Sequence, residues 1–408
     1  EFASDGLTGA DDYVMTQTFG VAPNRQFWIR WSNMEYGNPS SNLDNSFAVV
    51  LEETSNNIYL VDMRANNAAN LSTTLGLQNT STCGAAWMLD QVKPDATNTA
   101  LLADNDYYQF SPVTTLAGTY TVGGAASDFP ALSNGAALLG CGITGAVEFS
   151  VETGTYQEQV KIPIIPGVSA TDTVWIHSQS GDSTDVVYSW PSANAFGNNF
   201  TLQMNGSDYV TIQGMTFERT GTNLYGGVVE VTNQAENNRF LRNQFLGISG
   251  VATANRDLFS ANTLPNALQL FQNYFSGGSN GIILTGSTGY SPQVIVAGNI
   301  LENCYSRSVE ANLLLSPIIG LNEVTATTGS PTHTGYYIAN MQGPLYFAGN
   351  KSDVTGVGAY FLGNPNVTGI PSELNNNMLK GTTAGLTLAN TSLINFHFNS
   401  IQSSGAGG

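Results

Sequence analysis

Short runs of β-branched and aromatic residues, separated by Gly, Asn and Ser, recur along the whole chain. Four such runs fall within the first 112 residues, at 26–31, 47–52, 58–63 and 107–110. Runs of this length with turn residues between them are typical of β-strands. Strands that follow one another closely, joined by turns such as Ser55–Asn57, pack as sandwiches. We therefore predict that residues 1–112 form a β-sandwich domain.

One segment has a helical pattern instead. Apolar residues recur at helical spacing between Phe129 and Leu139, and Gly140 follows at the expected end. Ser127 or Asp128 could serve as the N-cap. We predict a single convincing helix here, as a cap on the region that follows.

A repeat dominates the rest of the chain, from residue 113 to residue 402. Seven asparagines precede short apolar stretches and lie 30, 26, 23, 28, 27 and 22 residues apart: Asn243, Asn273, Asn299, Asn322, Asn350, Asn377 and Asn399.

An apolar residue lies two positions after most of these asparagines. With Phe217 added one repeat earlier, the apolar series reads Phe217, Phe245, Phe275, Leu301 and Val324. Side chains on a strand alternate between its two faces, so this series fits one inward-facing position in successive repeats.

Repeats of this length predict a parallel β-helix. A single repeat cannot bury its apolar side, whereas stacked repeats pair each strand with the next and close a continuous core. An Asn at a turn tolerates left-handed backbone geometry, and its amide can hydrogen-bond to the Asn one repeat away. We therefore predict an all-β chain with a sandwich at 1–112, a parallel β-helix at 113–402 and a Gly/Ser-rich linker or tail at 403–408.

The composition of the chain excludes several classes of function. Only 10% of the residues are charged, against about 25% in ordinary soluble proteins. The net charge of −18 would repel phosphate backbones and anionic lipids, so nucleic-acid and membrane-surface roles are excluded. There is no apolar run long enough for a spanning helix, so we expect no membrane insertion. Four lysines in the whole chain, with abundant Tyr, Asn and Thr, are typical of an extracellular β protein.

Three cysteines, Cys83, Cys141 and Cys304, are too few and too scattered for a disulfide framework or a zinc site. Buried free thiols are the favoured interpretation, and one bridge between Cys83 and Cys141 is the alternative.

Calcium is the one cofactor that the sequence suggests. Asp11–Asp12, Asp44 and Asp104–Asp106 could offer oxygen ligands to Ca²⁺. Turn-forming Asp and Asn residues explain the same sequences more simply.

No catalytic residue is predicted. A polysaccharide lyase needs a Lys or Arg base beside a neutralised uronate. Arg219 and Arg242 flank adjacent repeats and could form such a cationic spot, but solvated or ion-paired surface arginines explain them equally well. His177, His333 and His397 lie far apart, so we expect them to be structural or solvated.

Glycoside hydrolysis needs two carboxylates across a groove. The repeat region contains acidic candidates but no close Asp-Asp pair: Asp208, Glu218, Glu230, Glu236, Asp257, Glu302, Glu310 and Glu323.

Exposed aromatic rings are the usual means by which an acidic protein of low charge holds carbohydrate. Trp190, Tyr225, Tyr290 and Tyr305 lie in or beside predicted loops, as do Tyr336 and Tyr337. The ligand-binding candidates are therefore Trp190, Tyr225, Tyr290, Tyr305, Arg219 and Arg242.

Two stretches carry resemblances to known families. The order Ser46–Leu51, Asn57–Leu60 and Gly76–Asn79 resembles a nidogen-like domain. The segments Gly118–Gly124, Ser127–Phe129, Cys141–Phe149 and Gly154–Val160 resemble the N-terminal cap and first coil of right-handed β-helices of the pectate-lyase-like superfold.

The order of the whole chain resembles large surface and secreted proteins of the bacterial type IX secretion system, including adhesins linked to gliding motility. This resemblance implies the type IX translocon as a partner, an extracellular or outer-surface location, and surface glycans or other cell-surface proteins as ligands. The leading prediction is an adhesin or scaffold with glycan binding. The alternative is a polysaccharide-degrading lyase or hydrolase, which convergent cations or paired acids on one coil face would favour.

Overall fold

The structure is a computed structural model, which describes residues 2–3, 13–36, 45–64, 88–89, 107–111, 115–124, 126–195, 197–248, 254–264, 266–287, 289–328, 330–364 and 369–405. The chain divides into two compact units, unit 1 at Glu1–Thr114 and unit 2 at Thr115–Gly408. Within the described residues the fold is all-β with one short α-helix, as predicted.

Unit 1 is built on one antiparallel sheet in the order β1-β3-β4-β5-β7-β6, with β2 also paired to β3. The predicted strands lie within β3, β4, β5 and β7. The described residues of unit 1 form this one sheet, and the second layer of the predicted sandwich is not among them. The strands are β1 (Phe2–Ala3), β2 (Tyr13–Phe19), β3 (Gln26–Tyr36), β4 (Asn45–Glu52), β5 (Ile58–Arg64), β6 (Met88–Leu89) and β7 (Tyr107–Ser111).

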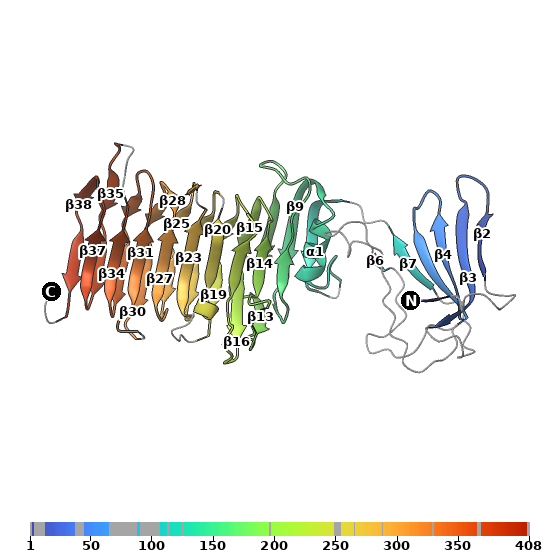
Figure 1. The fold of residues 1–408 in the computed structure, drawn as a ribbon, viewed down its shortest axis with the longest axis horizontal. Helices are drawn as coiled ribbons and strands as arrows, with labels where there is room; N and C mark the ends of the chain where they lie inside the picture. Colours follow the sequence, from blue (N-terminus) through green and yellow to red (C-terminus); the bar gives the residue numbers. More distant parts are fainter. Residues whose placement is uncertain are drawn as a thin grey trace. The chain divides into compact units, whose positions relative to one another are not determined.

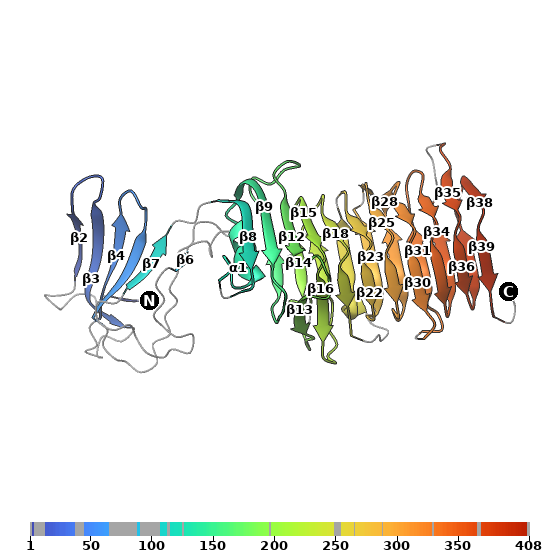
Figure 2. The same cartoon turned by 180° about the vertical axis from the view of Figure 1, so that it is seen from behind.

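Unit 2 is a parallel β-helix, which confirms the predicted architecture (Figures 1 and 2). Each coil contributes one strand to sheet 1, one to sheet 2 and one to sheet 3, in that order along the chain. All three sheets are parallel, because each strand pairs with its counterpart in the next coil. Outside them lie a short parallel pair, β24 (Ser291–Pro292) with β28 (Leu314–Leu315), and the 3₁₀-helix η1 (Ala254–Arg256).

The strands of each sheet are as follows. Sheet 1 contains β8 (Leu116–Val122), β9 (Ile143–Val151), β12 (Val174–Ser178), β15 (Val210–Gln213), β18 (Arg239–Leu241), β21 (Gln269–Phe271), β25 (Ile295–Ala297), β29 (Ile318–Gly320), β32 (Tyr346–Ala348), β35 (Ser372–Asn375) and β38 (Ile394–His397). Sheet 2 contains β10 (Gly154–Tyr156), β13 (Val186–Pro191), β16 (Thr216–Thr220), β19 (Gln244–Leu246), β22 (Tyr274–Ser276), β26 (Ile300–Glu302), β30 (Glu323–Ala326), β33 (Lys351–Val354), β36 (Met378–Gly381) and β39 (Ser400–Ser403). Sheet 3 contains β11 (Val160–Ile162), β14 (Leu202–Asn205), β17 (Val229–Thr232), β20 (Phe259–Leu264), β23 (Asn280–Gly286), β27 (Arg307–Asn312), β31 (Thr334–Ala339), β34 (Val357–Leu362) and β37 (Ala384–Ala389).

The asparagine ladder lies in the turn between sheet 1 and sheet 2. The Asn299 side-chain nitrogen donates to Asn322 Oδ1 at 2.9 Å, and its backbone N–H donates to the same oxygen at 3.0 Å. The same two donations join all seven predicted asparagines from coil to coil. Each side-chain nitrogen also donates to a strand carbonyl of the preceding coil, as Asn322 does to Val296.

The left-handed geometry predicted for these asparagines belongs instead to the residue before each one. Arg242 (φ 51°), Leu321 (φ 58°) and Phe398 (φ 55°) take this conformation, and Gly298 and Gly349 occupy the same turn position. The left-handed residue turns the chain by itself, and the Asn that follows is left free to bridge the coils.

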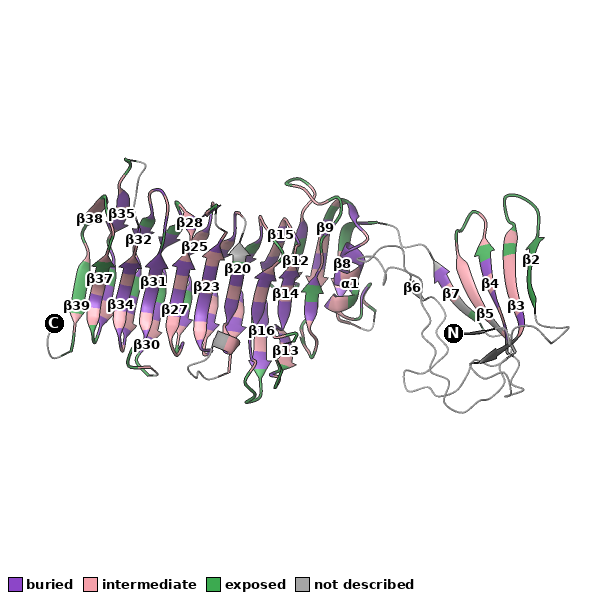
Figure 3. Ribbon diagram, in the orientation of Figure 1, coloured by how far each residue is buried: buried purple, intermediate pink, exposed green. Residues whose placement is uncertain are grey.

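The apolar series is confirmed as an inward row on sheet 2. Phe217, Phe245 and Phe275 are in register in adjacent coils and fully buried, and their rings stack with centroids 6.1 and 4.9 Å apart. Leu301 and Val324 continue the row. Figure 3 shows buried positions running along the strands of this unit.

The helix α1 (Leu132–Leu139) begins later than predicted. Pro130 disfavours helical geometry at Phe129, and neither Ser127 nor Asp128 is the N-cap. Instead, the Glu158 carboxylate from the first coil accepts the N–H groups of Leu132 and Ser133, both at 3.1 Å.

Among the cysteines, Cys141 is disulfide-bonded, so the interpretation of a free buried thiol is wrong for this residue. It holds for Cys304, which is free and buried. Cys83 lies outside the described residues.

Candidate functional site

The six ligand-binding candidates from the sequence lie along three different edges of the β-helix. Trp190, Arg219, Tyr225 and Tyr305 lie at or near the turns from sheet 2 to sheet 3. Arg242 lies in the turn from sheet 1 to sheet 2, and Tyr290 precedes β24 on the way from sheet 3 to sheet 1. The structure therefore does not gather them into one site.

Arg219 and Arg242 do not form the cationic spot of a lyase. Arg219 is only 3% exposed, and its guanidinium donates to the Phe200 and Tyr225 carbonyls and, at 3.4 Å, to Asn199 Oδ1. Burial lowers the pKa of Arg219 to about 10. This side chain braces the turns, whereas Arg242 is exposed on another edge.

The two remaining aromatic candidates, Tyr336 and Tyr337, lie on opposite faces of strand β31. Tyr336 belongs to the core, where its hydroxyl donates to the carbonyls of Asn322 (3.0 Å) and Lys351 (2.9 Å). Its neighbour Tyr337 is half-buried on the outer face of sheet 3. Alternation along β31 explains the difference.

The outer face of sheet 3 brings together the most distinctive group of side chains. Glu310 on β27, Tyr337 on β31 and Tyr360 on β34 are register partners in successive coils. Arg307 Nη1 lies 2.5 Å from Glu310 Oε2, and its guanidinium carbon lies 4.1 Å from the centre of the Tyr337 ring. The rings of Tyr337 and Tyr360 are parallel within 4°, with centroids 5.7 Å apart. We call these four residues the Arg–Tyr stack.

Asp257 lies beside this stack, just before β20. Asn280, the register partner of Arg307, donates to Asp257 Oδ1 at 2.7 Å. Burial raises the pKa of the Asp257 carboxyl to about 7, and the negative charge of Glu310 adds to the rise, against the hydrogen bond from Asn280. Asp257 is thus a carboxyl that holds its proton up to about neutral pH.

A second polar group lies beneath the face. Ser308 Oγ is 3.0 Å from His333 Nε2, and His333 Nδ1 is 3.2 Å from the Tyr305 carbonyl. Both Ser308 and His333 are buried, and burial lowers the pKa of His333. The pair holds the turn together, which agrees with the expected structural role of His333.

The other two histidines lie on sheet 1. His177 stacks on Trp175 with ring centroids 3.9 Å apart, and its Nε2 lies 2.9 Å from Glu148 Oε1. His397 is exposed on β38. The three histidines do not converge.

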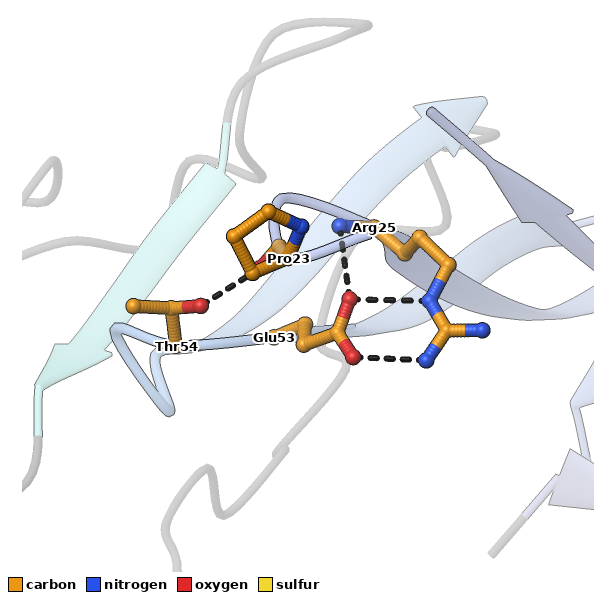
Figure 4. A network of polar contacts seen from close by, with 4 residues as sticks. All are labelled: Pro23, Arg25, Glu53 and Thr54. Atoms are coloured by element: carbon orange, nitrogen blue, oxygen red, sulfur yellow. Dashed lines mark hydrogen bonds and ion pairs between the residues drawn. The ribbon is translucent and has the colours of Figure 1, made fainter. Parts of the chain in front are cut away.

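In unit 1 the most prominent charged cluster is an exposed ion pair (Figure 4). Arg25 Nε and Nη2 donate to the two oxygens of Glu53 at 2.8 and 2.6 Å, and the Arg25 backbone N–H donates to the same carboxylate. Thr54 donates to the Pro23 carbonyl beside it. These contacts tie the β2–β3 turn to the β4–β5 turn and use both charged groups internally.

Metal ligands do not gather in the part of the chain that the structure describes: no three His, Cys, Asp or Glu residues lie together there. The calcium candidates Asp11–Asp12, Asp44 and Asp104–Asp106 lie outside the described residues. In the same described ranges, no helix is long and apolar enough to cross a membrane.

Among the comparisons with known proteins, one family model matches the N-terminal part of the chain. Residues 3–122 match the family model described as NIDO related, in agreement with the nidogen-like resemblance. No curated protein matches the chain.

Solved structures resemble the β-helix in fold alone. Pectin methylesterase from Aspergillus niger is 16% identical, with a TM-score of 0.32, over 72% of this chain and 88% of its own. The GH136 lacto-N-biosidase from Eubacterium ramulus is 11% identical, with a TM-score of 0.41, over 69% and 54%. Carrot pectin methylesterase is 10% identical, with a TM-score of 0.34, over 70% and 84%.

The structure and the family match together describe an all-β protein with a parallel β-helix, in which residues 3–122 match the NIDO-related family model. The Arg–Tyr stack was only partly accessible from the sequence. Asp257, Glu310 and Tyr337 were among the acids and aromatics considered, but Tyr360 was missed. Aligning residues 334–339 with 357–362, one repeat of 23 residues apart, would have found it.

Proposed function

We propose that the chain is a carbohydrate-binding β-helix protein that holds a glycan against the outer face of sheet 3. The observation that carries the proposal is the Arg–Tyr stack itself, in which Glu310 and the two rings are in register across adjacent coils and the Arg307 guanidinium lies over the Tyr337 ring. A sugar presents an apolar C–H face to an aromatic ring and hydroxyls to charged and amide groups. The ring at the end of the stack, Tyr360, supplies the first kind of contact, and Arg307, Glu310 and Asn280 supply the second.

Glycan binding suits both functions predicted from the sequence. It is the ligand contact of a cell-surface adhesin or scaffold, and it is the binding step of a polysaccharide-degrading enzyme. Export by type IX secretion, a role in gliding and an outer-surface location stay predictions.

The Arg307→Met variant tests the proposal. Methionine keeps much of the aliphatic stem but removes the ion pair with Glu310 and the contact with the Tyr337 ring, so we expect at least about a tenfold loss of glycan affinity. Stability should change by only about 1 kcal/mol, because the Arg307–Glu310 pair is partly exposed. The measurement is binding to a glycan array, followed by calorimetry on the best ligand.

Arg239→Met is the matched control, because Arg239 is an exposed arginine on the outer face of sheet 1 that bonds to Gln269. It should bind like the unaltered chain. The proposal fails if the unaltered chain binds no glycan, or if both variants bind equally well.

Glycoside hydrolysis is the second candidate function, favoured by the raised pKa of Asp257. A general acid must hold a proton near the working pH, and the pKa of Asp257, raised to about 7, allows this. Glu310, whose negative charge adds to the rise, is the candidate for the second carboxyl that the reaction needs. Asn280 fixes the Asp257 carboxyl by its hydrogen bond.

For this candidate, Asp257→Asn should lower the release of reducing ends from a bound glycan at least about 100-fold, because the amide cannot donate the proton. In the unaltered chain the rate should fall as pH rises through about 7, since the acid form of Asp257 is lost there. Asp208→Asn is the control: its pKa is also raised by burial, but it lies in a turn between sheet 3 and sheet 1. Binding without any release of reducing ends would leave the chain a binding protein.

A further inference from the structure

On the outer face of sheet 3, one side of the Tyr360 ring is not covered by another member of the Arg–Tyr stack. Tyr337 lies between Arg307, 4.1 Å from its ring centre, and the parallel ring of Tyr360. Both faces of Tyr337 are therefore in use within the protein. Only one face of Tyr360 is used in this way, because Tyr337 covers the side toward β31.

The next coil leaves the other side of Tyr360 open along the row. Its register partner on β37 is Thr387, and both residues are half-buried. Adjacent strands lie about 4.8 Å apart, so a ring in place of Thr387 would continue the stack. The Thr387 side chain is too short to cover the Tyr360 ring, and it presents a hydroxyl group instead of a ring.

Charge limits what can lie there. Within the strands of sheet 3, the charged residues are Lys161, Glu230, Arg307 and Glu310. Arg307 is neutralised by Glu310, and Lys161 lies on β11, at the opposite end of sheet 3 from β34. The net charge of the chain is −18. An anionic sugar beside Tyr360 would thus meet no free cation within this sheet and would be repelled by the protein as a whole.

We infer that this face takes an uncharged glycan and that one sugar ring stacks on the side of Tyr360 that faces Thr387. The inference rests on the proposed function and adds to it the substrate class and the position of the stacking contact. Arg307 and Glu310, at the other end of the stack, meet the hydroxyls of a further sugar of the chain, and they also hold Tyr337 and, through it, the plane of the Tyr360 ring.

Two variants of the full chain test the position. Tyr360→Ala removes the ring and with it the stacking contact, so it should weaken binding of a neutral polysaccharide by about tenfold. Thr387→Tyr fills the stacking position with a further ring, so it should lose binding by a similar factor while keeping or raising stability. The control is Tyr346→Ala, which removes a 48% exposed tyrosine from the outer face of sheet 1.

The probes are galactan, xylan and β-glucan as neutral chains, and polygalacturonate and alginate as anionic ones, each measured by affinity electrophoresis at low and moderate salt. We expect a neutral polysaccharide to bind with little dependence on salt. Both site variants should lose this binding, and Tyr346→Ala should keep it.

Preferential binding of an anionic chain would overturn the substrate class but leave the proposed function standing. Unchanged binding in Tyr360→Ala or Thr387→Tyr would overturn the stacking position. Failure of the unaltered chain to bind any of the panel, or any glycan on an array, would overturn the proposed function itself.

Discussion

Replacing Phe245 with Ala is expected to lower the free energy of unfolding of unit 2 by about 3–5 kcal/mol, which is the usual cost of emptying a buried aromatic position. Phe245 is fully buried. Its ring stacks on Phe275 and meets Phe240 and Phe259 edge to face, with centroids 6.2 and 6.1 Å away. The cavity would therefore open in the aromatic centre of three coils, and the fixed strand pairing limits how far they can close around it.

Urea unfolding followed by circular dichroism measures this loss. Phe271→Ala is the matched control, because Phe271 is 41% exposed on the outer face of sheet 1. Its loss should cost less than about 1 kcal/mol. Equal losses for the two variants would contradict the inward row as the source of stability.

Replacing Asn322 with Ala is expected to cost about 2–4 kcal/mol. The side-chain oxygen accepts two donors of Asn299, and the side-chain nitrogen donates to the Val296 carbonyl and to Asn350 Oδ1. Removing the amide leaves buried donors and acceptors in both neighbouring coils without partners, and such orphaned groups cost more than a hydrogen bond normally contributes.

The control for the ladder is Asn312→Ala. The Asn312 side chain accepts one hydrogen bond from Asn340 at 2.9 Å in an exposed position, where water can replace the lost partner. We expect a change within about 0.5 kcal/mol. Hydrogen exchange of the Asn299 backbone amide, which donates to Asn322 Oδ1, should accelerate in Asn322→Ala and not in Asn312→Ala. Equal exchange in both would show that the ladder does not hold the coils together.

The coil architecture could be predicted because the side chains that stabilise one coil recur at the same position in the next. One amide recurs in each coil from Asn243 to Asn399, and an inward apolar residue follows most of these asparagines, so Asn299 or Phe275 carries the same information as its counterparts. The residue that takes the left-handed backbone conformation in each turn could not be predicted in this way. That position is filled by residues as unlike as Gly298, Leu321 and Phe398. Their shared position beside the Asn shows only once the register is known.

Contacts between segments that are distant in the sequence could not be predicted either. The first turn of α1 is capped by Glu158, 26 positions after Leu132, rather than by a residue next to the helix. Both interpretations of Arg219 from the sequence, a cationic spot or a surface arginine, leave it accessible, yet its place on the inward face of β16 buries it among the carbonyls of two turns. A sequence position alone cannot show which acceptors a bend of the chain will supply.

The candidate site was predictable in kind but not in place. The sequence predicts aromatic rings in or beside loops, together with Arg219 and Arg242, as the contacts to a glycan. Tyr337 and Tyr360 instead lie on strand faces, where the parallel register stacks like positions above one another. Loop aromatics such as Tyr225 and Tyr290 end on different edges, because successive turns of one coil point in different directions.

The account is tested most directly by a crystal structure of the chain with an oligosaccharide to which it binds. We predict sugar density on the outer face of sheet 3, with one ring against Tyr360 above Thr387 and hydroxyls within hydrogen-bond reach of the Arg307–Glu310 end. Sugar bound only at unit 1, or on the faces of sheets 1 or 2 with the Arg–Tyr stack empty, would contradict it.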